Sequence, residues 1–292
     1  MSRPVVGIGE ILFDLLPQGP QLGGAPANFA YHVMRLGGCG YAVSAIGRDE
    51  LGERIKSILA EKELDSEIPE VDCPTGVVEV TLDDKGVPSY NIIQGVAWDN
   101  VPYTEKMKSL AKDCAAVCFG TLAQRSETSR ATIKSFLADT PEDCLKVYDI
   151  NLRQHYYSKE LVCESLESSD ILKINDEEIV VVSKLLGLSE DPTEACRQII
   201  GKYGLKLAVL TKGADGSDVI TLDAISSKKP LAGKIADTVG AGDSFTAAFV
   251  QCYLKGMPIE KAHEIANQVS SYVCTKSGAM PEYDESILTK IN

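Results

Sequence analysis

One segment of the sequence combines small residues with a carboxylate in the order that phosphoryl transfer requires. It reads Asp237-Thr238-Val239-Gly240-Ala241-Gly242-Asp243 and directly precedes a stretch of helical character. Backbone N–H groups of its three small residues can point outward from the helix N-terminus and hold an anion. Asp243 follows in the first turn, where its carboxylate could take the proton of an acceptor hydroxyl. Taken alone, the segment also fits a tight turn followed by an aspartate that complements the helix dipole.

A second segment has the residues to hold a polyol. In Gly23-Gly24-Ala25-Pro26-Ala27-Asn28 the paired glycines let a ligand approach the backbone, and Asn28 projects an amide that donates and accepts hydrogen bonds. Upstream, Asp14 closes a strand-like run that begins at Gly9, and its carboxylate suits a pair of sugar hydroxyls. The alternatives for these residues are an ordinary loop-to-helix turn and a surface aspartate on an edge strand.

Two common nucleotide-binding signatures are absent from the sequence. The motif G-x-x-x-x-G-K-[ST] does not occur, and Gly7-Ile8-Gly9 is followed by Leu12 where G-x-G-x-x-G requires its third glycine. P-loop and Rossmann interpretations are therefore disfavoured.

The elements that must position these residues alternate along the chain. Compact apolar runs that fit buried parallel strands alternate with segments of helical period, which predicts a layered α/β domain. The expected strands are residues 4–9, 41–46, 115–119, 145–149 and 206–211. The expected helices are residues 26–36, 51–61, 126–138, 159–166, 176–186, 193–203, 242–255 and 258–276.

One region breaks the alternation. Residues 75–82 alternate with period two, an Asp83-Asp84-Lys85-Gly86 turn follows, and residues 88–93 have the character of a second strand. Together with residues 12–23, this hairpin predicts a small second sheet that forms a lid beside the main sheet. Because a small sheet exposed on one side is poorly stable alone, its outer face is expected to mediate a homodimer.

Composition limits the classes of protein to consider. The chain has 292 residues, 44% of them hydrophobic, and 42 acidic against 29 basic side chains give a net charge of −13. We expect a single domain over residues 1–292, large enough to fold without disulfides. The acidic balance disfavours nucleic acid and anionic membranes as partners. Nine cysteines without a C-x-x-C pair favour a reducing cytoplasm, and no apolar stretch approaches the ~18 residues of a membrane span.

The segments, taken in order, resemble the ribokinase-like, or PfkB, family of carbohydrate kinases, and within it most closely the bacterial fructokinases. The resemblance covers nearly the whole chain, from about Gly7 to Pro281. The first family signature is matched by residues 23–30, 35–38 and 46–52, and the second by residues 237–245 without a gap. Further landmarks are Asp149-Ile150-Asn151-Leu152-Arg153, the N-x-x-E motif of residues 175–178, and Thr211-Lys212-Gly213-Ala214-Asp215-Gly216.

The resemblance implies a fold and a reaction. The fold would be an α/β, ribokinase-like three-layer α/β/α sandwich, with a mostly parallel central sheet and a small β-lid from about residues 12–23 and 74–98. The reaction would be ATP-dependent phosphorylation of a sugar hydroxyl, with Asp243 as the base and Gly240, Ala241 and Gly242 as the anion hole. Lid closure would exclude water and suppress hydrolysis of ATP.

The resemblance also implies roles for individual site residues. The sugar would be held by Asp14, Gly23, Gly24 and Asn28, with Arg153 near the sugar or the phosphoryl group. Asn175 and Glu178 would organise Mg²⁺ and its waters, with Glu178 acting through water, although Asn175 by itself has the character of a helix cap. Thr211, Lys212, Gly213, Gly216 and Asn267 would border the nucleotide.

Two ions are expected at this site. Because few basic residues surround it, turnover should require Mg²⁺ strictly. Members of the family often also hold a monovalent cation such as K⁺ near the second signature, where the Asp237 carbonyl could contribute.

Fructose is the expected acceptor, giving fructose 6-phosphate, because residues 9–14, 96–99 and 119–125 resemble fructokinase segments. A phosphorylated sugar would need additional cations, and the first half of the chain has no basic cluster. A 2-keto-3-deoxygluconate kinase stays open, because Arg125 and Arg153 with Tyr90 or Tyr103 could clamp a carboxylate. Ribokinase or nucleoside kinase activity also stays open. A non-catalytic sugar- or nucleotide-binding protein is the alternative of another class, and the intact second signature argues against it.

Overall fold

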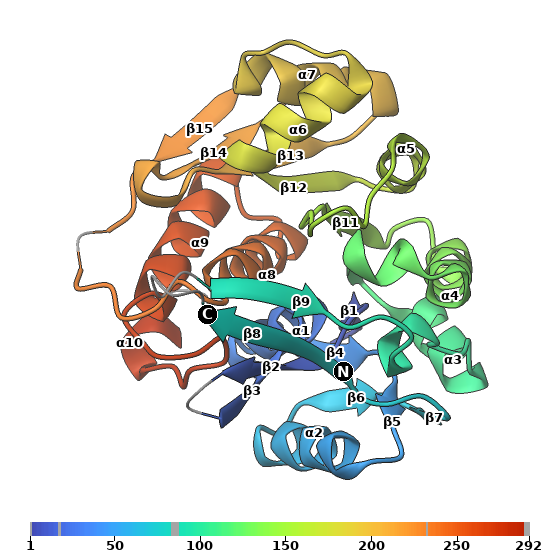
Figure 1. The fold of residues 1–292 in the computed structure, drawn as a ribbon. Helices are drawn as coiled ribbons and strands as arrows, with labels where there is room; N and C mark the ends of the chain where they lie inside the picture. The colour runs from blue at the N-terminus through green and yellow to red at the C-terminus, as the bar shows by residue number, and fades with distance from the viewer. Residues whose placement is uncertain (1, 17–18, 83–87, 232, 289–292) are drawn as a thin grey trace.

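The computed structural model describes residues 2–16, 19–82, 88–231 and 233–288 (Figure 1). In these residues one sheet has nine strands, in the order β15-β14-β13-β12-β11-β10-β1-β4-β6. Strands β6 to β13 of this order are parallel, whereas β14 and β15 close one edge as antiparallel strands, so the predicted mostly parallel sheet is confirmed. The strands are β1 (Pro4–Ile8), β4 (Cys39–Val43), β6 (Asp65–Glu67), β10 (Ala116–Gly120), β11 (Leu145–Asp149), β12 (Ile171–Asn175), β13 (Leu207–Thr211), β14 (Ser217–Ile220) and β15 (Ile225–Lys228).

Helices cover both faces of this sheet and complete the predicted three layers. Alternate residues of β1 belong to opposite cores: Val5 to the one that contains Phe29, and Val6 to the one that contains Phe136. Strands buried on both faces explain why the sequence shows continuous apolar runs. One layer contains α1 (Ala25–Arg35), α8 (Ala241–Leu254) and α9 (Ile259–Val273), and the other α3 (Glu105–Asp113), α4 (Glu127–Asp139), α5 (Lys159–Glu167), α6 (Asp176–Leu186) and α7 (Pro192–Tyr203).

Local signals in the sequence set the ends of several helices. The N-cap Asp49 accepts a hydrogen bond from Gly52 N at 2.8 Å at the start of α2 (Glu50–Glu61). Asp191 caps α7 in the same way, and Gly187 and Gly204 end α6 and α7 in the left-handed conformation. The short remaining helices are α10 (Glu285–Leu288) and the 3₁₀ turns of residues 97–99, 122–125 and 213–215. No helix in the described part of the chain is long and apolar enough to cross a membrane.

The predicted lid is a separate four-stranded sheet in the order β3-β2-β8-β9, visible in Figure 1 apart from the main sheet. It is built from β2 (Leu12–Leu16), β3 (Gly19–Gly23), β8 (Gly76–Leu82) and β9 (Pro88–Ile92), which lie within residues 12–23 and 74–98. β2 follows shortly after β1, and Asp14 lies in the middle of β2 and not at the end of a strand as expected. The predicted turn of residues 83–86 lies outside the described residues.

The structure differs from the expected elements in a few places. The strand expected over residues 41–46 is divided: β4 ends at Val43, and Ile46–Gly47 forms β5, which pairs with β7 (Glu70–Val71) in a small sheet of its own. Several further elements have no counterpart among those expected: β6, β7, β12, α3, α10 and the β14–β15 hairpin. In β12 a lysine, Lys173, interrupts the apolar run that would have indicated a buried strand.

Candidate active site

The two segments singled out by their chemistry meet at the carboxyl-terminal edge of the sheet. Asn28 of α1 donates from Nδ2 to Oδ2 of Asp243 in the first turn of α8 at 2.8 Å, across 215 residues of sequence. Gly240 is the N-cap of α8 with φ 77°, and a Cβ there would lie 2.7 Å from the carbonyl oxygen of Ala279. Both facts require glycine. Gly240 has no side chain to cap α8, and the N–H of Ala241 donates to Thr238 O at 3.3 Å, so the N–H groups of Gly242 and Asp243 are left for a ligand.

Asp243 has the electrostatics of a base that works near neutral pH. Loss of solvation raises the pKa of its carboxyl group to about 6, and the charge of Asp149 acts in the same direction. The hydrogen bond from Asn28 and the charges of Lys173 and Arg153 lower this pKa, in that order of size. The side chain nevertheless stays partly accessible, so a substrate hydroxyl can reach it.

Lys173 and Asp149 form a buried ion pair beside Asp243 that the sequence analysis did not predict. Lys173 Nζ lies 3.1 Å from Asp149 Oδ1, and the two residues are 8% and 5% exposed. They are direct neighbours in register on β12 and β11. In the sequence, Asp149 stands out only as the first residue of a segment that resembles the family. The available signal for Lys173 was a charged residue inside an otherwise apolar run.

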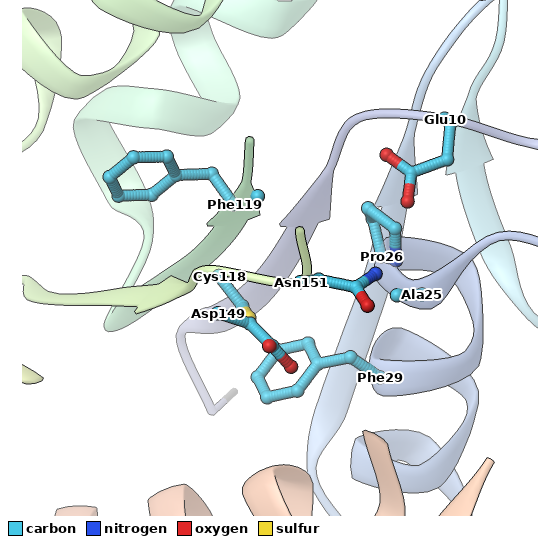
Figure 2. Close-up of a pocket in the computed structure, with 9 residues that line it drawn as sticks. Glu10, Ala25, Pro26, Phe29, Cys118, Phe119, Asp149 and Asn151 are labelled. Carbon is cyan, nitrogen blue, oxygen red and sulfur yellow. The ribbon is translucent and has the colours of Figure 1, made fainter. Parts of the chain in front are cut away.

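Glu10 is a second acid that sequence reasoning missed. It follows β1, is 4% exposed, and its Oε2 has no hydrogen-bond partner. Burial raises the pKa of Glu10 to about 7. Figure 2 shows it at a small pocket shared with Pro26, Phe29, Asp149 and Asn151. The site therefore contains more carboxylates than its motifs indicated.

The residues predicted to hold the sugar gather around the same point. Gly24 has φ 116°, and a Cβ there would collide with the carbonyl oxygen of Glu10. A Cβ on Gly23 would lie 2.9 Å from Oδ2 of Asp14, whose pKa is raised by burial. Arg153 is exposed, and its charge lowers the pKa values of Asp14, Glu10 and Asp243. The structure thus brings Asn28 into contact with Asp243, and it places Gly23 beside Asp14.

Asn175 and Glu178 form the start of α6. Asn175 Oδ1 accepts from the N–H of Glu178 at 2.8 Å, and Glu178 Oε2 accepts from the N–H of Asn175 at 2.9 Å. The other oxygen of Glu178 accepts from Leu152 N at 2.9 Å, and burial raises the pKa of this carboxyl group. Asn175 is therefore a helix cap, and its role toward Mg²⁺ stays a prediction. No group of three His, Cys, Asp or Glu among the described residues could hold a metal ion.

The residues predicted to border the nucleotide come from three parts of the fold: Thr211 from β13, Lys212, Gly213 and Gly216 from the turn between β13 and β14, and Asn267 from α9. Thr211 ends β13 beside Asn175 in register, and Lys212 Nζ contacts Asp218 Oδ2 at 2.6 Å. Gly213 has φ 51° and opens the turn that leads to Gly216. A Cβ on Gly216 would collide with the carbonyl oxygen of Lys228, and Asn267 Nδ2 donates to Lys229 O at 2.8 Å.

Two residues considered for a carboxylate clamp are engaged elsewhere. Arg125 donates to both carboxylate oxygens of Asp99, at 2.8 and 2.9 Å, and its guanidinium carbon lies 4.0 Å from the centroid of the Trp98 ring. The hydroxyl of Tyr103 donates to Asp139 at 2.8 Å. Arg125 thus holds the segment that follows the lid, Tyr103 is fixed to the end of α4, and Arg153 is left as the clamp candidate.

Comparison with known proteins decides the family. The model of the pfkB family of carbohydrate kinases matches residues 19–285. The chain belongs to the pfkB carbohydrate kinase family. The expectation of an ATP-dependent carbohydrate kinase is confirmed at this level, and so is the ribokinase-like fold.

Individual relatives in this family differ in their acceptors. The uncharacterised sugar kinase PH1459 of Pyrococcus horikoshii is 28% identical over 98% of this chain and 95% of its own, and its crystal structure has a TM-score of 0.84, or 0.82 in complex with ATP. Fructokinase-1 of Oryza sativa subsp. japonica is 25% identical over 96% of this chain and 93% of its own. A 5-dehydro-2-deoxygluconokinase of Bacillus anthracis is equally similar, at 25% over 96% and 93%.

Proposed function

We propose that this carbohydrate kinase transfers the γ-phosphoryl group of ATP to a hydroxyl of fructose, giving fructose 6-phosphate. The observation that carries the proposal is the hydrogen bond between Asn28 and Asp243 at the uncapped N-terminus of α8. It joins the polyol-binding segment to the anion-binding segment at one point. Asp243 takes the proton of the sugar hydroxyl, and the first N–H groups of α8 hold the transferring phosphoryl group.

ATP and Mg²⁺ are the proposed cofactors. The ATP complex of the Pyrococcus relative supports the nucleotide. The buried carboxylate of Glu178 offers oxygen, which suits Mg²⁺ bound through water. Bound Mg²⁺ would neutralise phosphate charge that the protein's few local cations cannot balance. A monovalent cation beside Asp237 completes the proposal.

The charges at the site favour a neutral acceptor. Three carboxylates, those of Glu10, Asp14 and Asp243, lie near the sugar-binding segment, and the exposed cation close to all of them is Arg153. An acceptor with its own carboxylate or phosphate would be repelled by this set. Fructose has no charge and offers hydroxyls to each acid. The fructokinase among the relatives agrees with this choice.

A kinase for a carboxylated sugar is the second candidate, because one observation favours it. Arg153 is exposed, and its planar fork can bind a carboxylate with two hydrogen bonds. The 5-dehydro-2-deoxygluconokinase among the relatives fits this interpretation. The commitment of Arg125 to Asp99 removes the second half of such a clamp, so fructose stays the first choice.

A coupled assay of ADP release on a sugar panel tests the proposal. The panel contains fructose, ribose, 2-keto-3-deoxygluconate, adenosine and fructose 6-phosphate, and fructose should give the highest kcat/KM. Asp243→Asn should lower kcat by about 10³-fold, because it removes the base. Asp113→Asn, at an exposed position on α3, is the matched control and should leave activity unchanged. Wild type that phosphorylates no sugar refutes the kinase, and full activity of Asp243→Asn refutes the base.

A further inference from the structure

A lysine buried among carboxylates is the least expected feature of this site. Lys173 lies in the middle of β12, and its side chain is 10% exposed. Burying an ammonium group is costly unless it is paired and hydrogen-bonded. Its Nζ donates to Asp149 Oδ1 at 3.1 Å, which uses one of its three N–H donors. A parallel sheet with apolar residues on both faces has no structural need for such a pair.

Lys173 also packs against the first turn of α8. A Cβ built on Gly242 would lie 3.2 Å from Nζ and 3.5 Å from Cε of Lys173. Gly242 therefore leaves the space that the lysine side chain fills. The ammonium group reaches the residue that directly precedes Asp243. A substitution of Lys173 would therefore perturb the first turn of α8, which carries Asp243.

The charges around Asp243 come from several elements of the fold. Two carboxylates, Asp149 and Glu10, and two cations, Lys173 and Arg153, act on it, and Glu178 acts on Lys173. The two cations are therefore outnumbered by four carboxylates, that of Asp243 included, at a site that is also proposed to bind anionic phosphates. The groups that face Asp243 are Asn28 of α1, Glu10 after β1, Cys118 of β10, Asp149 of β11, Arg153 after β11 and Lys173 of β12.

We propose that the Lys173–Asp149 pair is a positioning element for the base. Lys173 supports the first turn of α8 at Gly242 and supplies positive charge where the phosphoryl group crosses, while Asp149 fixes the lysine and repels the ionised form of Asp243. The two members act on the base in opposite directions. The inference rests on the proposed function in one respect, the role of Asp243 as the base.

Asp149→Asn tests the electrostatic part of this role. The amide oxygen can still accept from Lys173, but the negative charge beside Asp243 is gone. The acidic limb of the kcat/KM profile for the sugar should move to lower pH by roughly one unit, because a like charge no longer disfavours ionisation of the base. A merely structural pair would lower stability and leave the limb in place. An unmoved limb, or one shifted to higher pH, overturns the proposal.

Lys173→Met tests the supply of positive charge. It should lower kcat by about 10²-fold, as expected when one stabilising group is lost from a transfer site, and Lys173→Arg should retain more activity than Lys173→Met. The double variant with Asp149→Asn removes both charges of the pair, so its melting temperature should lie above that of Lys173→Met while kcat stays low. Wild-type kcat in a folded Lys173→Met or in the double variant overturns the proposal.

The same assays separate this inference from the proposed function. The pH profiles use whichever sugar of the panel the wild type phosphorylates fastest. A wild type that phosphorylates no sugar refutes both. Turnover of any sugar with an unmoved Asp149→Asn limb refutes the role of the pair alone and leaves the kinase in place.

Discussion

Helices α6 and α8 begin at the same edge of the sheet, and each has an acid at its third position, yet the two acids are used differently. In α6 the carboxylate of Glu178 folds back onto the N–H of Asn175, whose side chain caps the helix in return. In α8 the cap is Gly240, without a side chain, and Asp243 reaches across to Asn28 of another helix.

The difference shows which terminus is free to bind. The first N–H groups of a helix need partners, and a capping box supplies them from within the helix. The α6 terminus is therefore satisfied by its own residues. The α8 terminus lacks a side-chain cap, so the N–H groups of Gly242 and Asp243 and the partial positive charge of the terminus are available to an external anion. We infer that the N-terminus of α6 has a structural role at the site, whereas the N-terminus of α8 binds the transferring phosphoryl group.

Removing Mg²⁺ should cause the largest loss of turnover at the proposed anion site of α8. One helix N-terminus and a few local cations cannot balance a polyphosphate, so excess EDTA should lower turnover by about 10³-fold or more. The measurement is ADP release before and after chelation, and added Mg²⁺ in excess of EDTA should restore the rate. Substantial activity in EDTA would contradict this prediction.

Gly240→Ala should distort the backbone at the same N-terminus of α8. A Cβ would meet the Ala279 carbonyl oxygen and is strained at φ 77°, so the first N–H groups should be displaced and kcat should fall by about 10²-fold. Gly256→Ala is the matched control, because Gly256 follows the other end of α8 with φ 72° and has no atom within 4 Å of its Cβ position. Equal losses in the two variants would show that backbone strain, and not the anion site, is responsible.

The pH dependence should report the acid of α8 and not that of α6. The pKa of Asp243 is raised to about 6, and its ionised form is the base of the proposed reaction. The protonated form prevails below pH 6, so kcat/KM should fall about tenfold per pH unit there and reach a plateau above it. The profile is measured with the coupling enzymes in excess at each pH. Constant kcat/KM through pH 6 would contradict the assignment of the base.

The sequence predicted those parts of the site that lie in contiguous motifs. Gly240 to Asp243 and Gly24 to Asn28 each carry their chemistry in one segment, and the structure joins them. Pairings between segments could not be foreseen in the same way. Lys173 has its partner on the neighbouring strand, and Arg125 is held by Asp99. Spacing along the chain indicates helices, strands and turns, whereas such pairs depend on which strands become neighbours.

The smallest expected effect comes from removing the side-chain cap at the N-terminus of α6. Asn175→Ala removes the α6 cap and should cost about 1 kcal/mol of the free energy of unfolding, a fall of a few degrees in melting temperature. Asn175→Ser keeps a capping oxygen and should recover most of that stability. The pair of variants also separates the cap from the predicted role toward the nucleotide. If KM for ATP is unchanged in both variants, Asn175 only caps the helix. If KM for ATP rises in both variants while only Asn175→Ala lowers the melting temperature, the Asn175 amide also binds the nucleotide. An unchanged melting temperature in Asn175→Ala would show that the α6 terminus is held by Glu178 without its cap, and the contrast with α8 would then rest on that carboxylate.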